Sequence, residues 1–236
     1  NSEVQIDYWI KSKLDSSWAY VWIEVTEIPA SSTTLVYMYY GNPTATSESN
    51  GTETFIFFDD FEQDTVGQQP SKWVVNEETS NGVRVTDTYA RHGSKSLKIY
   101  SEYGNEDTIE RTFTAMAKYV LHYSFLQDLS TLGIGFLHFS GETQAIWMGI
   151  RDSQLQYYDT SYHAITTISL GTWYDVEVRV NTDTDTFDCY VDGVLKLDDG
   201  AFRNAVSSVD KLLTNAWVNQ DPWRTYIDTV FIRNYA

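Results

Sequence analysis

Apolar and polar residues alternate with a period of two along most of the chain, and apolar stripes with helical spacing do not extend over ten residues. A period of two places successive side chains on opposite faces of a β-strand. The pattern predicts an all-β protein of many short strands joined by turns, which is typical of a sandwich. We expect strands at Val4–Ile10, Ala19–Val25, Thr34–Tyr40, Thr54–Phe58, Arg84–Thr86, Ser96–Tyr100, Lys118–Gln127, Leu132–Phe139, Ile146–Arg151, Gln154–Tyr158, Ile165–Ser169, Trp173–Asn181, Thr186–Val191, Leu212–Asn219 and Tyr226–Arg233.

The alternation stops between Tyr40 and Gly51, where turn-forming residues take over. We place a module boundary at this point, with a partial N-terminal β module at residues 1–50 and a second module at residues 53–236. Residues 1–43 hold about three expected strands, and a sheet of this size is marginal in water. We therefore expect residues 1–43 to dock on the rest of the chain, on a neighbouring protein chain or on a missing N-terminal half.

Charge and apolar run length exclude two classes of partner. The chain has 16 basic and 33 acidic residues, a net charge of −17, so nucleic-acid phosphates and anionic lipid surfaces should repel it. The longest apolar runs, such as Leu35 to Tyr40, are six residues long, far below the roughly 20 that span a bilayer. We expect no nucleic-acid binding and no membrane insertion. The acidic, tyrosine-rich composition suits an extracellular or cell-surface protein.

Residues 24–43 read EVTEIPASSTTLVYMYYGNP and follow the aromatic segment Tyr8-Trp9-Ile10. This stretch resembles the second half of a prokaryotic surface-protein domain family of unknown function. The resemblance covers about 40 residues. It implies that the first half of the family's domain is absent and that Asn1 marks a boundary made by processing or proteolysis.

Three segments of the second module carry another resemblance. They are FFDDFE at residues 57–62, GTWYDVEV at residues 171–178 with the following YVDGV at residues 190–194, and YIDTVFIR at residues 226–233. Together they are similar to the concanavalin A-like/laminin G-like jelly roll. The resemblance implies a concanavalin A-like jelly-roll sandwich, a fold shared by carbohydrate-binding modules, lectins, adhesion domains, glycoside hydrolases and polysaccharide lyases. Fold alone does not choose among these functions.

Carboxylates near the two ends of this sandwich suggest a structural ion. The resemblance implies that the first and last strands lie side by side, and in such sandwiches a calcium ion often links them. Asp228 has apolar neighbours, where an unpaired acid is costly, and Ca²⁺ takes six to eight oxygen ligands. We expect a structural Ca²⁺ at a site formed by Asp60, Glu62 and Asp228 with backbone groups at Gly93 and Lys95. The alternative is that Asp228 caps a turn and the other acids are solvated.

Catalytic motifs are weak. Glucanases of this fold place their carboxylates as Glu-x-Asp-x-x-Glu on one strand, and that string does not occur in this sequence. A lyase would need a tyrosine or histidine base, for which His122, His138 and His163 with Arg151 could be recruited. A lone histidine on a strand is more often packed or solvent-exposed than catalytic. We assign no catalytic residues, although an enzyme stays an open alternative.

Exposed aromatic residues next to polar ones are the strongest functional signal. Trp and Tyr rings stack on the apolar C–H faces of sugars, while amides, acids and arginines bind hydroxyl groups. In residues 145–151 the alternation turns Ile146, Met148 and Ile150 to the core and Trp147, Gly149 and Arg151 to the open face. Tyr158, followed by Tyr162 and His163, could rim the same face. The candidate ligand-binding residues are Trp147, Arg151, Tyr158, Trp217, Asn219 and Trp223.

The sequence thus predicts a noncatalytic carbohydrate-binding or adhesion module of a larger secreted or surface protein, with a polysaccharide or cell-surface glycan as its partner. One alternative is a structural subunit of a cell-surface layer or filament, in which residues 1–43 complete the sheet of a neighbouring protein chain. A second alternative is a polysaccharide lyase or glycoside hydrolase with unfamiliar catalytic residues.

Overall fold

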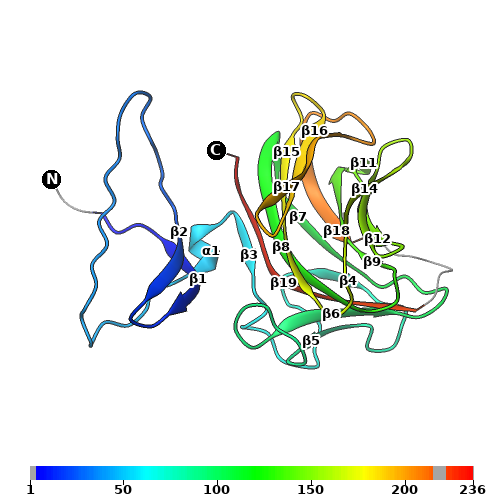
Figure 1. The fold of residues 1–236 in the computed structure, drawn as a ribbon, viewed down its shortest axis with the longest axis horizontal. Coiled ribbons are helices and arrows are strands. Elements are labelled where there is room, and N and C mark those ends of the chain that lie inside the picture. Colours follow the sequence, from blue (N-terminus) through cyan, green and yellow to red (C-terminus); the bar gives the residue numbers. More distant parts are fainter. Residues whose placement is uncertain (1–3, 215–221, 236) are drawn as a thin grey trace. The chain divides into compact units, whose positions relative to one another are not determined.

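A computed structural model of the chain describes residues 4–214 and 222–235. The chain divides into two compact units, Asn1–Ile56 and Phe57–Ala236 (Figure 1). Among the described residues, no helix has both the length and the apolar character needed to cross a membrane.

The N-terminal unit is built on one antiparallel hairpin, made of β1 (Tyr8–Leu14) and β2 (Trp18–Ile23). A single helical turn, α1 (Gly51–Thr54), follows later in the chain and is capped by the side chain of Asn50. Phe55 packs edge-on against Trp9 and Trp22 of the hairpin, each at 5.9 Å between ring centroids. These three rings are the small core of this unit.

The strand expected at Thr34–Tyr40 is absent, and this prediction was wrong. The segment has strong β propensity, but no ladder of backbone hydrogen bonds forms along it in the structure. Strand propensity reflects packing on a pleated, half-buried surface, so a segment without a neighbouring strand does not adopt it. Its large side chains stay exposed, with Tyr37 at 66% and Tyr40 at 88% of their surface accessible.

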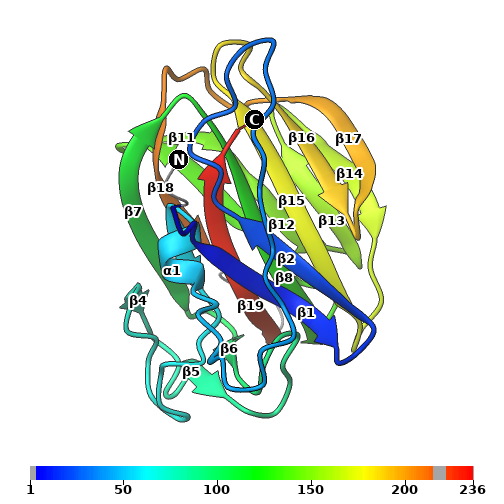
Figure 2. The ribbon, with the colours of Figure 1, turned by 90° about the vertical axis from the view of Figure 1, so that its left-hand side faces the viewer.

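The larger unit is a sandwich of two antiparallel layers that face each other (Figure 1). In the first layer, the strand order is β17-β16-β15-β8-β19-β6-β5, and β3 also pairs with β19 (Figure 2). The strands of this layer are β3 (Phe57–Asp59), β5 (Val83–Thr86), β6 (Ser96–Ser101), β8 (Lys118–Leu129), β15 (Trp173–Asn181), β16 (Thr186–Val191), β17 (Val194–Ala201) and β19 (Trp223–Asn234).

The second layer consists of two groups of strands, ordered β11-β10-β18-β7-β4 and β14-β13-β12-β9. The two groups are continuous because β9 runs into β10 through Gly135 and β11 runs into β12 through Trp147. The strands are β4 (Val74–Asn76), β7 (Thr108–Met116), β9 (Gly133–Ile134), β10 (Phe136–Ser140), β11 (Thr143–Ile146), β12 (Met148–Arg151), β13 (Gln154–Tyr158), β14 (Tyr162–Thr167) and β18 (Val209–Thr214).

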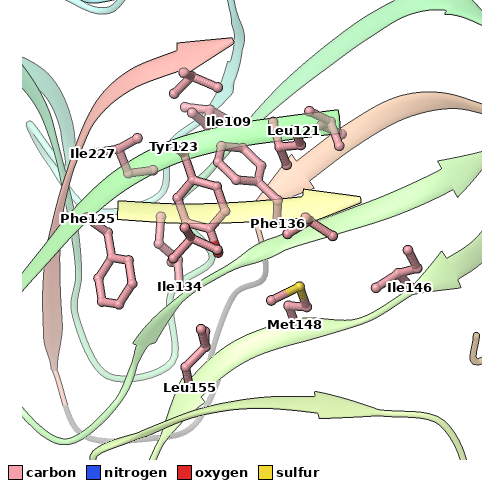
Figure 3. Close-up of a cluster of buried hydrophobic side chains, with 14 of the residues drawn as sticks. Ile109, Leu121, Tyr123, Phe125, Ile134, Phe136, Ile146, Met148, Leu155 and Ile227 are labelled. Carbon is pink, nitrogen blue, oxygen red and sulfur yellow. The ribbon is translucent and has the colours of Figure 1, made fainter. Parts of the chain in front are cut away.

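The core fills the space between the two layers. Figure 3 shows aromatic and aliphatic side chains from both layers in contact, among them Tyr123 and Phe125 of β8 and Phe136 of β10. Phe136 lies 5.0 Å from Tyr123 in an edge-to-face pair. Burial of this many large side chains is the main source of stability in such a fold. The prediction of an all-β jelly-roll sandwich is confirmed.

Three strands, β4, β7 and β17, lie outside every predicted strand. In β7 the core-facing position between Ile109 and Phe113 is Arg111, which breaks the apolar alternation. Its guanidinium lies 4.7 Å from the centre of the Phe57 ring and donates to the carbonyl of Lys72, so a charged side chain is accommodated on the inner face. The strand β17 lies at the edge of its sheet and is mostly exposed, which leaves little period-two signal.

Candidate ligand-binding face

The outer face of the second layer displays the residues that the alternation around Trp147 predicted. Ile146, Met148 and Ile150 are at most 1% exposed and belong to the core, as expected. Trp147 and Arg151 therefore lie on the opposite face of the layer, where both are partly exposed. This part of the prediction is confirmed at the level of side-chain direction.

Tyr162 of β14 is the centre of an aromatic cluster on this face, with 47% of its surface exposed. The Trp147 ring meets it edge-on at 5.5 Å, and the Tyr158 ring lies 4.9 Å away. The guanidinium of Arg151 sits 4.9 Å from the centre of the Tyr162 ring. The turn between β13 and β14 creates this arrangement, because it brings Tyr158 opposite Tyr162 as a register pair.

A fifth member of the cluster, Arg203, comes from a distant loop. Its guanidinium lies 5.1 Å from the centre of the Tyr158 ring and donates to the side-chain oxygen of Gln144. The loop is fixed against β11, because the backbone N–H of Arg203 donates to Ala145 (2.7 Å) and the Asn204 side chain donates to the carbonyl of Gln144 (2.8 Å). Sequence analysis missed Arg203. No motif surrounds it, and only the packing of the loop brings it to Tyr158.

We call the five residues Trp147, Arg151, Tyr158, Tyr162 and Arg203 the aromatic–arginine platform. One further polar atom lies beside it. The side-chain nitrogen of Gln156 donates to the Arg151 carbonyl (3.3 Å) and to Gln154 (3.1 Å), whereas its side-chain oxygen is buried without a hydrogen-bond partner. Buried acceptors are normally satisfied, so this oxygen is an exception, and its burial keeps it out of reach of a ligand on the outer face.

One other residue of the predicted ligand site does not join the platform. Trp223 is 1% exposed and belongs to the core, so the prediction that its ring is open to a ligand was wrong. Its position in β19, an interior strand of the first layer, turns the ring inward. Trp217 and Asn219 lie outside the described residues.

A shallow hollow of about 260 Å³ lies on the outer face of the same layer, over β7, β18 and the β10–β11 turn. Lys211 lines it, 3.4 Å from Glu142 and 4.0 Å from Glu110, with its ammonium 4.9 Å from the centre of the Phe139 ring. Asp210, also in the lining, accepts from the backbone N–H of Gly141 (2.9 Å). The positive charge of Lys211 is therefore matched by nearby carboxylates.

A serine, a histidine and an aspartate meet on the turn that carries Tyr162, but they do not form a proton relay. Ser161 Oγ and Asp159 Oδ1 both contact His163 Nε2, each at 3.0 Å. A relay needs the base and the orienting acid on different ring nitrogens. Hydrogen bonds from the backbone N–H groups of Thr160 and Ser161 hold the pKa of Asp159 well below its ordinary value, with His163 contributing. The arrangement stabilises the turn.

The other two histidines proposed as lyase bases are inside the protein. His138 is fully buried, shares a hydrogen bond with Tyr119, and burial lowers its pKa to about 3. His122 is 5% exposed and stacks on Phe231 at 4.6 Å. Neither ring can reach a polysaccharide substrate, so their recruitment as lyase bases is not supported.

The residues expected to bind calcium surround the loop at residues 91–95. The first and last strands of the sandwich, β3 and β19, do pair, as the resemblance implied. Asp228 is fully buried, and its Oδ2 accepts from the backbone N–H groups of Arg91 (2.7 Å) and His92 (2.9 Å). Burial raises the pKa of Asp228 to about 7 despite these hydrogen bonds. The next residue, Thr229, has φ of +52°, a strained value for a β-branched residue, at a bulge in β19.

Glu62 holds the other end of this loop. Its Oε1 accepts from the backbone N–H groups of Ser94 (2.8 Å) and Lys95 (2.6 Å), and a Cβ at Gly93 would lie 2.6 Å from the Glu62 carboxyl group. The position therefore needs glycine, which also has φ of +64°. Asp60 accepts from the backbone N–H of Glu62 at 3.3 Å. Asp228 and Glu62 thus bind amides of the loop, while Asp60 binds the amide of Glu62.

The ammonium of Lys95 already binds oxygen atoms beside the expected calcium site. It donates to the backbone carbonyls of Glu62 (2.9 Å) and Asp64 (2.7 Å). As arranged, these groups do not fit Ca²⁺, because the ion would compete with an ammonium for carbonyl oxygens and with amides for carboxylates. Calcium bound by Asp60, Glu62 and Asp228 stays a proposal that requires Lys95 to move. A different acidic group, Asp188, Asp198 and Asp199, is the one set of three possible ligands that clusters among the described residues.

Comparison with known proteins finds a family match over part of the chain. A domain of unknown function (DUF2341) matches residues 1–76, a span that includes the whole N-terminal unit and the first strands of the sandwich. No curated protein matches the sequence.

Solved structures share the fold of the sandwich at low sequence identity. A sialidase superposes with a TM-score of 0.64 at 13% identity, over 76% of this chain and 18% of the sialidase. The cellulose-induced protein Cip1 gives 0.59 at 17% identity, over 76% of this chain and 97% of Cip1. Domain 4 of AbnA, an extracellular arabinanase from Geobacillus stearothermophilus solved with arabinotriose, superposes with a TM-score of 0.51 at 12% identity. The match covers 76% of this chain and 92% of that domain. This likeness concerns the fold, because the same fold hosts many functions.

Proposed function

We propose that this chain is a noncatalytic carbohydrate-binding or adhesion module of a larger extracellular or cell-surface protein. The observation that carries the proposal is the aromatic–arginine platform, in which Trp147 and Tyr162 lie 5.5 Å apart on the outer face of a rigid sheet. Rings on strands lose little conformational entropy on binding, and they offer flat surfaces to the C–H faces of sugars. Arginine side chains at the edge would bind hydroxyl groups.

The comparisons support this proposal at the level of fold. Proteins with this sandwich include one domain solved with arabinotriose and proteins named for action on carbohydrates. The sialidase, Cip1 and AbnA domains are at most 17% identical to this chain, so the ligand must be inferred from the residues of this chain. The lyase alternative finds little support in the described histidines, because His122 and His138 are buried and His163 is held in its own turn by Ser161 and Asp159.

The test is retention on a panel of immobilised polysaccharides. Each aromatic contact contributes about 1 kcal/mol, so replacing both Trp147 and Tyr162 by alanine should weaken retention by roughly 10- to 100-fold. Tyr103→Ala is a matched control, because Tyr103 is 67% exposed in the same unit and lies outside the platform. The single variant Tyr162→Ala is measured as well. It leaves the half-buried Trp147 in place, so a loss of retention in this variant does not come from a folding defect at Trp147.

Two results would overturn the proposal. One is that the wild-type chain binds no polysaccharide or cell-surface glycan on the panel. The other is that the double variant, with an unchanged melting temperature, is retained as strongly as the wild type. Release of soluble oligosaccharide from the retained polymer would instead favour an enzyme.

A second candidate function rests on the N-terminal unit. Residues 37–40 are aromatic or apolar and at least 66% exposed, which is unusual for a contiguous stretch in a monomer. Such a surface favours a structural subunit that contacts neighbouring protein chains through residues 1–43. The measurement is the molar mass in solution by light scattering. Concentration-dependent assembly that is lost in a Tyr37→Ser/Tyr40→Ser variant would support it, and a monomer at all concentrations would exclude it.

A further inference from the structure

Arg203 is unusual among the exposed arginines of this protein because no carboxylate of the described residues pairs with it. Six arginines, at positions 84, 91, 151, 179, 224 and 233, lie within ion-pair distance of an aspartate or glutamate. Arg111 lies against the Phe57 ring on the inner face of its sheet. Among the described residues, Arg203 interacts with a neutral amide, Gln144, and with a tyrosine ring. The chain carries 33 acidic residues against 16 basic ones, so an outward-facing cation without an acidic partner is unexpected.

The second guanidinium of the platform is only weakly neutralised. Arg151 lies 3.5 Å from Asp152, a side chain with 75% of its surface exposed. An exposed ion pair of this kind contributes little and exchanges easily with another anion. Asp159, the other acid nearby, already accepts hydrogen bonds from its own turn and from His163. The platform therefore presents two guanidinium groups to which an external anion can bind.

The hollow elsewhere on the same layer gives the contrast. There Lys211 lies close to Glu110 and Glu142, and Asp210 lines the same hollow. An anion would meet repulsion from these carboxylates. On this outer face the guanidinium groups of Arg151 and Arg203 are therefore less closely paired with carboxylates than the ammonium of Lys211 is.

We propose that the platform binds an acidic glycan, a polysaccharide that carries uronic-acid carboxylates. This inference rests on the proposed carbohydrate-binding function. The planar guanidinium forms paired hydrogen bonds with a carboxylate, which makes arginine the preferred partner for this group. Trp147 and Tyr162 stack on the sugar rings, and Arg203 and Arg151 bind the carboxylates.

The net charge of −17 does not prevent this binding. At physiological ionic strength the Debye length is about 8 Å, so charges elsewhere on the surface are largely screened from the platform. Contacts at the two arginines act over hydrogen-bond distance and are not screened in this way. The charged groups of the platform therefore decide whether the acidic or the neutral polymer is preferred.

The experiment compares polygalacturonate with the same polymer after methyl esterification, which removes the charge and leaves the sugar backbone unchanged. We expect the wild-type chain to bind the acidic polymer at least 10-fold more tightly. Arg151→Gln and Arg203→Gln should each reduce this ratio several-fold, and together they should bring it close to one. The ratio for Arg203→Lys should lie between those of the wild type and Arg203→Gln, because lysine keeps the charge but does not form the paired hydrogen bonds.

Lys211→Gln is the matched control, because it removes a positive charge from the same outer face at a position already paired with carboxylates. It should leave the ratio unchanged. Equal wild-type binding of both polymers, or an unchanged ratio in the double arginine variant with a native melting temperature, overturns the acidic-glycan inference while the proposed function stands. If the wild type binds neither these two polymers nor any other on the panel, both fail.

Discussion

The two units of this protein are equally rich in aromatic residues and use them in opposite ways. In the sandwich, Tyr123 and Phe136 are 1% exposed, and their rings pack between two layers. In the N-terminal unit, only a few rings such as Trp9 are buried, while Tyr39 and Tyr40 are 77% and 88% exposed. Sequence composition alone does not distinguish them.

The difference comes from the number of layers. A sheet buries one face only when a second layer covers it, and the sandwich supplies that layer from its own chain. The N-terminal unit has a two-stranded hairpin and one helical turn, which cannot cover the aromatic residues at positions 37–40. A stretch of the same residue type is thus core in one unit and surface in the other.

The largest expected effect tests this comparison directly. Phe136→Ala removes a ring that contacts Tyr123 and Trp73, so we expect a loss of about 3–5 kcal/mol in the free energy of unfolding. Tyr40→Ala removes a similar ring from an exposed position and should change the free energy of unfolding by less than about 0.5 kcal/mol. Denaturant unfolding of both variants measures the contrast. Similar losses for the two variants would mean that Tyr40 is buried in solution.

A second effect concerns pH and belongs to the sandwich alone, because the described carboxylates of the N-terminal unit are exposed. Burial raises the pKa of Asp228 from an ordinary value near 4 to about 7. The protonated acid therefore favours the folded state. This contribution is complete below about pH 4 and is lost as pH rises through 7, by up to about 1.4 kcal/mol per pH unit.

Asp228→Asn keeps an oxygen to accept from Arg91 and His92 but cannot ionise. We expect the variant to lose this decline, so that the difference in stability between variant and wild type grows in the variant's favour from pH 4 to pH 8. Urea unfolding at several pH values gives the slopes. Parallel pH profiles for the two proteins would show that Asp228 stays ionised in the fold.

The smallest expected effect is on ion binding near the strained bulge. Since Lys95 already occupies the carbonyls of Glu62 and Asp64, exhaustive chelation should leave the wild-type melting temperature within about 1 °C. Lys95→Met frees these oxygens and should make the melting temperature rise with added Ca²⁺. If chelation lowers the wild-type melting temperature and Ca²⁺ restores it, the ion binds despite Lys95 and the calcium proposal is sustained.

The sequence by itself determined the all-β architecture and the direction of side chains along single strands. Period-two alternation turned Ile146, Met148 and Ile150 inward and left Trp147 outside, because this depends only on the pleat of one strand. The prediction for Trp223 was wrong for another reason, since the expected strand begins at Tyr226 whereas β19 begins at Trp223 and carries its ring into the core.

Only the tertiary structure decided which distant residues meet. Arg203 reaches Tyr158 because its loop packs on β11, and Lys95 reaches the carbonyl of Glu62 because β3 and β6 both neighbour β19. The segment at Thr34–Tyr40 has the composition of a strand but lacks the partner that would make it one. Which strands pair and which layer covers a sheet are properties of the whole fold. For this reason the local sequence pattern predicted the rings of the platform but not Arg203.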